Sequence, residues 1–261
     1  MPGWYEKNYW KTGFMSRLYD FLTPEAYFES MRQTASLVAE KKEGKIWDAG
    51  CGSGLLLVFL QSVLRKRVNY FGTDLLFAGL KKLKFRSREL RVSSNAICLQ
   101  NDISVAPPFK ENSIDIVIAH FSLYTISDDD KRLQALKNIF HVLKPGGMLI
   151  ATCPSKNYDA EKIISKSLKL VADKNGLLVA IIKRYFFYPL TKKLGLSFIQ
   201  KQLQSGKWIS YTLASFQEEL RQTGFDIGAS ESVYAESAYL LCGHKSSYQQ
   251  IGTRVPLFFQ R

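Results

Sequence analysis

Three glycines at alternate positions mark the stretch of this sequence with the clearest chemical potential. Residues 46–54, IWDAGCGSG, run from apolar residues through Asp48 to Gly50, Gly52 and Gly54. Glycine has no Cβ and adopts positive φ at little cost, so a strand that turns into a helix through glycines brings backbone N–H groups close to a ligand. Many sheets turn in this way for packing alone, so the pattern needs support from elsewhere in the chain.

Acidic residues at the ends of the next two predicted strands give that support. Asp74 closes the predicted strand 68–73, and Asn101 and Asp102 follow the predicted strand 96–100. An acid at the end of the second strand can accept hydrogen bonds from both hydroxyls of a ribose. An acceptor at the end of the third strand can bind an adenine amino group. Because neighbouring parallel strands end at one edge of the sheet, one adenosine-containing ligand could touch all three sites.

Strand-like and helix-like segments alternate from residue 44, and they form the scaffold that brings these residues together. The predicted strands are 45–49, 68–73, 96–100, 113–121 and 148–152, and the predicted helices are 54–64, 75–90 and 128–143, with a turn at 144–147. Later, a helix at 213–222 precedes two strands, 225–233 and 238–244, whose short link favours an antiparallel hairpin. Strands joined by helices predict a parallel sheet that binds ligands at its carboxyl edge.

Taken in order, these motifs resemble those of class I S-adenosylmethionine (SAM)-dependent methyltransferases. The matching segments are DAGCGSG at 48–54, FGTD at 71–74, NDI at 101–103, DIVIAHFSLY at 115–124 and KPGG at 144–147. The resemblance covers residues 25–154 well and 213–244 in outline. An NAD-binding dehydrogenase would carry a glycine at position 55, which is Leu here.

The resemblance implies a fold and a division of the chain. The expected fold is α/β, with a Rossmann-like, mostly parallel sheet of order 3-2-1-4-5-7-6, strand 7 antiparallel, helices on both faces and a helical cap. Residues 1–43 would form an N-terminal helical lid, and 44–154 the SAM-binding core. Residues 155–210 would be an inserted helical cap on the acceptor side, and 211–261 would complete the sheet and end in a tail.

The resemblance also implies cofactor contacts, with SAM as cofactor, S-adenosylhomocysteine (SAH) as product and no metal. Asp48 would hold the ammonium of the methionine moiety, and Asp74 the ribose hydroxyls. The backbone of Gly50, Cys51 and Gly52 would line the methionine part, and the backbone near His120 would lie beside the transferred methyl. Leu75 and Asp102 would contact the adenine, with the Ile103 N–H at a ring nitrogen. Tyr19 would cover the cofactor in a lid with Tyr9 and Trp10. For the three acids the alternative is a turn or a helix cap, and for the lid aromatics it is core packing.

Methyl transfer from a sulfonium is an in-line displacement that requires alignment and exclusion of water more than any one side chain. His120, at the end of the fourth predicted strand, is the candidate general base, with a hydrogen-bonded pocket wall as the alternative. Tyr124 is the candidate for orienting the acceptor. Cys153 faintly resembles a cysteine of RNA cytosine-5 methyltransferases, but the Pro-Cys pair of those enzymes is missing, so we treat it as a buried small residue.

The distribution of charge bears on the acceptor. The net charge is +13, and the excess lies in 81–91, with six Lys and Arg against one acid, and in 155–210, with eleven against three. Segment 155–210 is also rich in aromatic and apolar residues, which favours a hydrophobic small-molecule or lipid-like acceptor and peripheral contact with an anionic membrane; the apolar tail 255–261 fits the same hypothesis. One alternative is an RNA methyltransferase that grips phosphates with 81–91 and 155–210. A second is a non-catalytic SAM- or SAH-binding protein, and a solvated basic face is the simplest explanation of the charge.

Cysteine usage and the N-terminal sequence bear on the compartment. The four cysteines are scattered, unlike a zinc site or a disulfide framework. The first residues carry charges where a signal peptide has an apolar core, and no apolar run is long enough to cross a bilayer. We therefore expect a cytoplasmic protein, and the sequence leaves its oligomeric state open.

Overall fold

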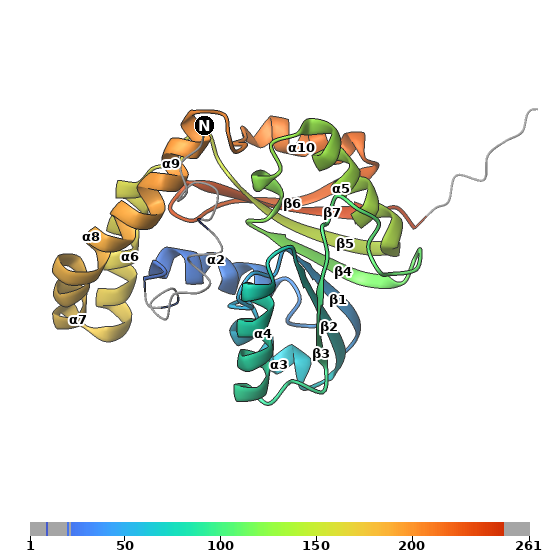
Figure 1. The fold of residues 1–261 in the computed structure, drawn as a ribbon, viewed down its shortest axis with the longest axis horizontal. Coiled ribbons are helices and arrows are strands. Elements are labelled where there is room, and N and C mark those ends of the chain that lie inside the picture. The colour runs from blue at the N-terminus through green and yellow to red at the C-terminus, as the bar shows by residue number, and fades with distance from the viewer. Residues whose placement is uncertain (1–8, 10–19, 21, 248–261) are drawn as a thin grey trace, which may run out of the picture.

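A computed structural model describes residues 9, 20 and 22–247 of the chain, and its centre is a seven-stranded sheet (Figure 1). The strands are β1 (Glu43–Ala49), β2 (Arg67–Asp74), β3 (Ala96–Gln100), β4 (Ile114–His120), β5 (Leu143–Pro154), β6 (Phe225–Val233) and β7 (Ala238–Lys245). Their order is β3-β2-β1-β4-β5-β7-β6. The first five pair in parallel, and β7 runs antiparallel to both β5 and β6. The predicted order and the antiparallel seventh strand are confirmed.

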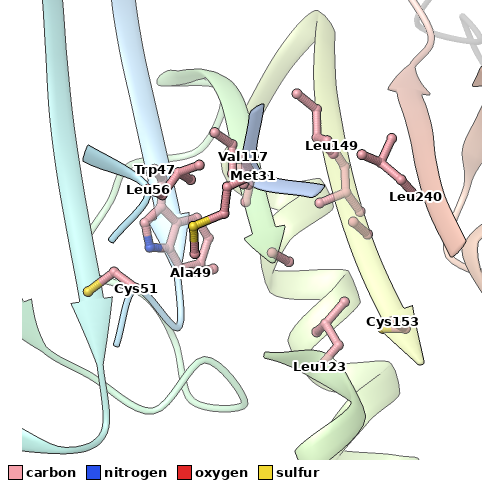
Figure 2. Close-up of a cluster of buried hydrophobic side chains, with 14 of the residues drawn as sticks. Met31, Trp47, Ala49, Cys51, Leu56, Val117, Leu123, Leu149, Cys153 and Leu240 are labelled. Carbon is pink, nitrogen blue, oxygen red and sulfur yellow. The ribbon is translucent and has the colours of Figure 1, made fainter. Parts of the chain in front are cut away.

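Helices cover both faces of the sheet (Figure 1). One face carries α2 (Glu25–Ser36), α3 (Leu57–Leu64) and α4 (Phe77–Glu89), and the other carries α5 (Asp129–Val142) and α10 (Leu213–Gln222). The central strands are therefore buried on both sides, which is why they read as continuous apolar runs rather than as an alternating pattern. Figure 2 shows Trp47, Val117, Leu149 and Leu240, which come from β1, β4, β5 and β7, with Met31 of α2 packed over the first of these strands.

The KPGG segment differs from the predicted turn. Strand β5 already begins at Leu143, which pairs with Ile114, and the next pair of the ladder joins Met148 to Ile116. Residues 144–147 therefore bulge out of a strand that is paired on both sides of them, and Gly146 takes a φ of 75° within the bulge. The glycines weaken the strand locally without ending it.

The segment between β5 and α10 is helical and extends as an arm beside α2 (Figure 1). It comprises α6 (Ala160–Asn175), α7 (Leu177–Ile182), a π-helical turn η2 (Lys183–Phe187), α8 (Tyr188–Thr191), a second π-helical turn η3 (Lys192–Leu196) and α9 (Ser197–Gln204). The side chain of Asp159 caps α6 by accepting from the N–H of Glu161 at 2.8 Å. The arm is fixed to α2, because the Ala26 N–H donates to the Ser167 hydroxyl at 3.0 Å.

No helix among the described residues is long and apolar enough to cross a membrane. Within the same residues, no group of His, Cys, Asp and Glu could hold a metal ion. Tyr19 and Trp10, two of the three aromatics predicted for the lid, lie outside the described residues.

Candidate functional site

The glycine loop after β1 is a tight turn that only glycine fits. The N–H groups of Gly50 and Cys51 both donate to the Thr73 carbonyl oxygen, at 2.8 and 2.9 Å, which ties the loop to the end of β2. Gly50 has a φ of 84°, and a Cβ on it would lie 2.3 Å from the Ser122 Cβ. Any side chain here would be both strained and in collision with the segment after β4.

Asp74 lies beside this loop at the end of β2. Its two carboxylate oxygens accept from the N–H of Gly52 and of Leu76, both at 2.8 Å. Burial raises the pKa of Asp74, and these two hydrogen bonds oppose the rise. A carboxylate has about four acceptor positions, so a carboxylate held in this way can still accept two hydroxyl groups. The adjacent Leu75 is 60% exposed, so its apolar side chain is accessible to a ligand that packs on it.

The loop after β3 supplies the third polar group. Asp102 accepts from the N–H and the hydroxyl of Ser104, at 2.9 and 2.7 Å, so one of its oxygens serves as a turn cap. The Asn101 Oδ1 atom is buried and has no hydrogen-bond partner among the described residues. The Asn138 side-chain amide, from α5, donates to the Ile103 carbonyl at 3.1 Å and so holds the loop in place. Sequence reasoning missed Asn138, because nothing local to α5 indicates a partner 35 residues away.

Asp48 is the buried charge of the site. Its side chain is at the end of β1, with 2% of the residue exposed, and the Tyr70 hydroxyl donates to it at 2.6 Å. Burial raises the pKa of Asp48 to about 7, the Tyr70 hydrogen bond lowers it, and the neighbouring Asp74 raises it further. A buried carboxylate in this position gains most from a cationic group placed against it.

These groups form one site at the carboxyl ends of three adjacent strands. Since β3, β2 and β1 are neighbours in the sheet, Asp102, Asp74 and Asp48 follow one another along its edge. The arrangement offers a hydroxyl-binding carboxylate, a loop without a Cβ at Gly50, an unpartnered amide oxygen at Asn101 and a buried anion. Such a set fits the amino, diol and ammonium groups of SAM, so these residues could hold that cofactor.

Comparisons with known proteins agree with this geometry. Residues 47–151 match the family model described as "Methyltransferase domain". The chain is 25% identical to the ubiquinone/menaquinone biosynthesis C-methyltransferase UbiE of Shewanella frigidimarina over 78% of this chain and 73% of that protein. It is also 25% identical to the tRNA (carboxymethyluridine(34)-5-O)-methyltransferase of Arabidopsis thaliana, over 61% of this chain but only 37% of the relative. The fold matches the crystal structure of a SAM-dependent methyltransferase from Aquifex aeolicus at 14% identity, with a TM-score of 0.55 over 82% of this chain and 89% of that one.

The chain is a class I SAM-dependent methyltransferase. SAM is accordingly its cofactor. In this methyltransferase the glycine loop, Asp48, Asp74 and the β3 loop lie together as the sequence predicted, while the individual contacts stay predictions. Tyr19, also predicted to touch the cofactor, lies outside the described residues.

His120 of this methyltransferase lies in a closed network of hydroxyl groups. Its Nδ1 is 3.2 Å from the Thr34 hydroxyl and 3.1 Å from that of Thr152, and its Nε2 is 3.3 Å from the Ser30 hydroxyl. Ser30 donates its only proton to the Tyr27 carbonyl, at 2.8 Å, so Nε2 carries the imidazole proton and Nδ1 accepts. Burial lowers the pKa of His120 to about 3, which keeps it neutral. The geometry favours a residue that positions α2 on the sheet, and the role as general base stays a prediction.

Aromatic side chains gather beside the glycine loop at the same edge. We call Tyr27, Phe121, Tyr124, Tyr158 and Tyr234 the aromatic cluster. The Tyr27 ring is 5.4 Å from Phe121 and 5.8 Å from Tyr234, and the Tyr234 ring is 6.2 Å from Tyr158. The cluster borders the glycine loop, because Phe121 directly precedes Ser122, whose Cβ would lie 2.3 Å from a Cβ on Gly50. Burial raises the pKa of the Tyr158 hydroxyl, and a hydrogen bond with Tyr234 opposes the rise.

A strained turn holds Tyr234 in the cluster. Tyr234, Ala235 and Glu236 have φ values of 55°, 56° and 61°, a left-handed run of three residues that have side chains. Such a conformation costs about 1–2 kcal/mol per residue. Ser155 secures the turn, because its hydroxyl donates to the Glu236 carbonyl at 3.0 Å and its N–H donates to the Ser237 carbonyl at 2.9 Å. Strain of this kind concentrates at functional sites.

Arg86 has a role that its sequence context did not indicate, whereas Cys153 has the predicted one. Arg86, in the basic segment 81–91, points inward, where it forms an ion pair with Asp20 and donates to the Ser53 carbonyl of the glycine loop. It therefore links the glycine loop to the N-terminal region rather than joining a basic surface. Cys153 is buried, and burial raises the pKa of its thiol, which excludes a ready nucleophile and agrees with the prediction of a small packing residue.

Proposed function

We propose that this methyltransferase transfers the methyl group of SAM to a hydrophobic small molecule with an oxygenated aromatic ring, bound in the aromatic cluster. The proposal rests on the position of the cluster at the glycine loop, where Phe121 precedes the Ser122 that packs on Gly50 and where the methionine part of the cofactor would be. Rings at these separations pack on one another and form an apolar wall on which a planar guest would stack. The relative named for ubiquinone and menaquinone biosynthesis supports an acceptor of the quinone type.

The cofactor's residues are assigned as the resemblance implied. Asp74 accepts from the ribose hydroxyls and Leu75 packs on the adenine. Asp102 and the N–H of Ile103 contact the rim of the adenine. The backbone of residues 50–52 lines the methionine part, and Asp48 binds its ammonium. Bound SAM supplies a methyl group on a leaving group that is already activated.

The protein's contribution is alignment in a dry site. A nucleophilic carbon or oxygen of the acceptor would bond to the methyl carbon as the sulfur–methyl bond breaks, SAH would leave as the thioether, and the acceptor's proton would pass to bulk water as the products leave. Tyr158 is suited to donate to a ring oxygen, because its hydroxyl is buried in the cluster beside Tyr234. Tyr124, whose ring packs 5.5 Å from Trp208, would orient the acceptor. His120 can act as the predicted general base only if substrate binding breaks its hydrogen bonds to the surrounding hydroxyl groups.

Transfer of labelled methyl from SAM tests the proposal. The acceptors are a reduced naphthoquinone with an isoprenoid tail, total RNA, and a cell extract separated into lipid, RNA, protein and polar fractions. We expect label in the quinol and in the lipid fraction, loss of label in Asp74→Ala, and a raised KM for the quinol in Tyr158→Phe. Label in RNA alone would overturn the proposal.

An RNA acceptor is the main alternative. The two basic segments and the tRNA-modifying relative support it. Against it, Arg86 of segment 81–91 is engaged inside the protein, and the arm of segment 155–210 exposes large apolar side chains, which do not favour contact with phosphates. A protein that binds SAM or SAH without catalysis would bind both ligands and label no fraction.

A further inference from the structure

The tip of the arm exposes a continuous apolar face. Within α7 and η2 the six most exposed large apolar side chains are Leu177, Leu178, Ile181, Ile182, Tyr185 and Phe186, and Val179 beside them is 37% exposed. Successive members of the six are one and three residues apart, so the pattern repeats every four residues, and Leu178 and Phe186 are 71% and 74% exposed. Ala180 is the buried residue of α7, and none is buried in η2. Among the described residues nothing covers these six, which we call the tip face.

The backbone explains why the tip face stays in register. An α-helix has 3.6 residues per turn, so a repeat of four drifts slowly around it. A π-helical turn has wider hydrogen-bonded rings, closed between residues five apart, and it corrects that drift. The change from α7 to the π-helical η2 therefore keeps residues 177, 181 and 185 in one row and 178, 182 and 186 in a second. Two parallel rows of large apolar side chains form one flat strip.

Cationic side chains border the strip. Lys183 and Arg184 lie within η2, with Lys183 placed over the Tyr188 ring at 5.9 Å and Arg184 over the Tyr185 ring at 5.9 Å. Lys174, at the end of α6, is instead paired with Glu25 of α2 at 3.6 Å, so Lys183 and Arg184 are the cations that this segment offers. An apolar strip with aromatic residues and a rim of Lys and Arg is the composition of a segment that lies in a membrane interface.

We infer that the tip face docks the methyltransferase onto an anionic lipid bilayer, with the six apolar side chains in the headgroup–acyl boundary and the cations on the lipid phosphates. Charge and polarity favour a bilayer over the two other possible occupants of the tip face, a second copy of the chain and a nucleic acid. A second copy would bring a chain of net charge +13 and a like-charged arm against the first. A nucleic acid would match the cations but would leave the apolar rows in contact with phosphates.

The position of the arm relates the bilayer to the acceptor site. The far end of the arm carries Phe198 on α9, whose ring stacks on Tyr9 at 4.3 Å, and Trp208, which packs on Tyr124 of the aromatic cluster. Delivery of a lipophilic acceptor from the bilayer to this cluster rests on the proposed function. Docking itself rests on the tip face alone.

The test is flotation of the full chain, without SAM or acceptor, with vesicles of pure phosphatidylcholine or of phosphatidylcholine with about a third of phosphatidylglycerol. We expect binding to the anionic vesicles, reduced by salt. The triple variant Leu178→Gln, Ile182→Gln, Phe186→Gln should bind about tenfold less. The variant Lys183→Gln, Arg184→Gln should lose chiefly the preference for anionic lipid. SAH affinity and melting temperature of each variant should match the wild type, which shows that the fold is intact.

Phe85→Gln is the matched control, because Phe85 is 62% exposed on the basic helix α4, away from the arm. It should bind vesicles like the wild type, and a loss of binding in this variant would move the docking surface to α4 and overturn the proposal. The proposal also fails if the triple variant floats like the wild type, or if the wild type does not float. A wild-type dimer that the triple variant dissociates, measured by sedimentation, would assign the tip face to a second copy instead. Because no step measures methyl transfer, these outcomes are independent of the proposed function.

Discussion

Among the single residues of the site, Asp48 should contribute most to cofactor binding. Its carboxyl group is buried, is close to a second acid, and has one hydrogen bond, from Tyr70. Asp48→Asn keeps the shape and can still accept from Tyr70, but it removes the charge that the cofactor's ammonium needs. Hydrogen bonds to charged groups contribute about 1.5–3 kcal/mol, so we expect the Kd for SAH to rise by about tenfold to a hundredfold. Calorimetric titration measures it; an unchanged Kd would remove Asp48 from the site.

The pH dependence of SAH binding follows from the same group. The pKa of Asp48 is about 7 without ligand, and only the ionised carboxylate attracts an ammonium. Affinity should therefore be constant just above pH 7 and should fall about tenfold for each pH unit below it. Binding at pH 6 should release a proton, which titrations in buffers of different ionisation enthalpy detect. Asp48→Asn should give a flat profile, and a wild-type profile that is flat from pH 5 to 7 would contradict the assignment.

At the scale of elements, the left-handed turn between β6 and β7 makes a prediction of its own. Ala235 has a φ of 56°, where glycine is not strained. Ala235→Gly should therefore stabilise the protein by about 1 kcal/mol, against the usual effect of this substitution. The control is Ala172→Gly within α6, which should destabilise by about the same amount. Denaturant titration measures both, and destabilisation by Ala235→Gly would show that the turn is not strained as described.

Elements also show where sequence reasoning succeeds. The glycine loop and Asp74 were predictable because each lies at the end of a strand whose apolar run is unmistakable, and the turn chemistry is local. The KPGG bulge was not, since a strand that continues past a bulge depends on pairing with Ile114 across the sheet. Strand order followed from the resemblance rather than from the residues.

The aromatic cluster and the His120 network could not be predicted in this way. The five cluster residues come from four separate segments, and only the folded sheet edge brings them together. His120 was correctly placed at the end of β4, but its three hydroxyl partners lie on α2 and β5. The sequence predicted either a base or a hydrogen-bonded pocket wall; the hydrogen bonds of the buried imidazole agree with the second, and the role as a base stays a prediction. The sequence likewise placed Arg86 in a basic run, because its partners, Asp20 and Ser53, are far from it in the chain.

At the scale of the whole molecule, two buried groups give opposite pH dependences of stability. The pKa of Asp48 is raised from 3.8 to about 7, so the folded state holds its proton longer and stability falls as pH rises from about 4 to 7. The pKa of His120 is lowered from 6.5 to about 3, so stability falls as pH drops below 6.5. Between pH 4 and 6.5 the two effects offset each other. Above pH 6.5 only the destabilisation caused by the ionised, buried carboxylate of Asp48 remains.

Asp48→Asn separates these two effects. At pH 8 it should stabilise the ligand-free protein by up to about 4 kcal/mol, because about three pKa units of charge burial are removed. Its stability should rise from pH 4 to 6.5, where the wild type is nearly flat, as His120 alone then acts. Thermal unfolding across this range measures both curves. If the variant is less stable than the wild type at pH 8, the conclusion that burial raises the pKa of the Asp48 carboxyl group is contradicted.

The most direct test of the account is a crystal structure of the protein with SAH. We predict the ribose hydroxyls on Asp74, the adenine beside Leu75 and Asp102, and the amino group on Asp48. The sulfur should face the cluster of Tyr27, Phe121, Tyr124, Tyr158 and Tyr234. SAH bound away from the glycine loop, or bound there with its sulfur directed away from these aromatic rings, would contradict the claim that methyl transfer takes place at the cluster.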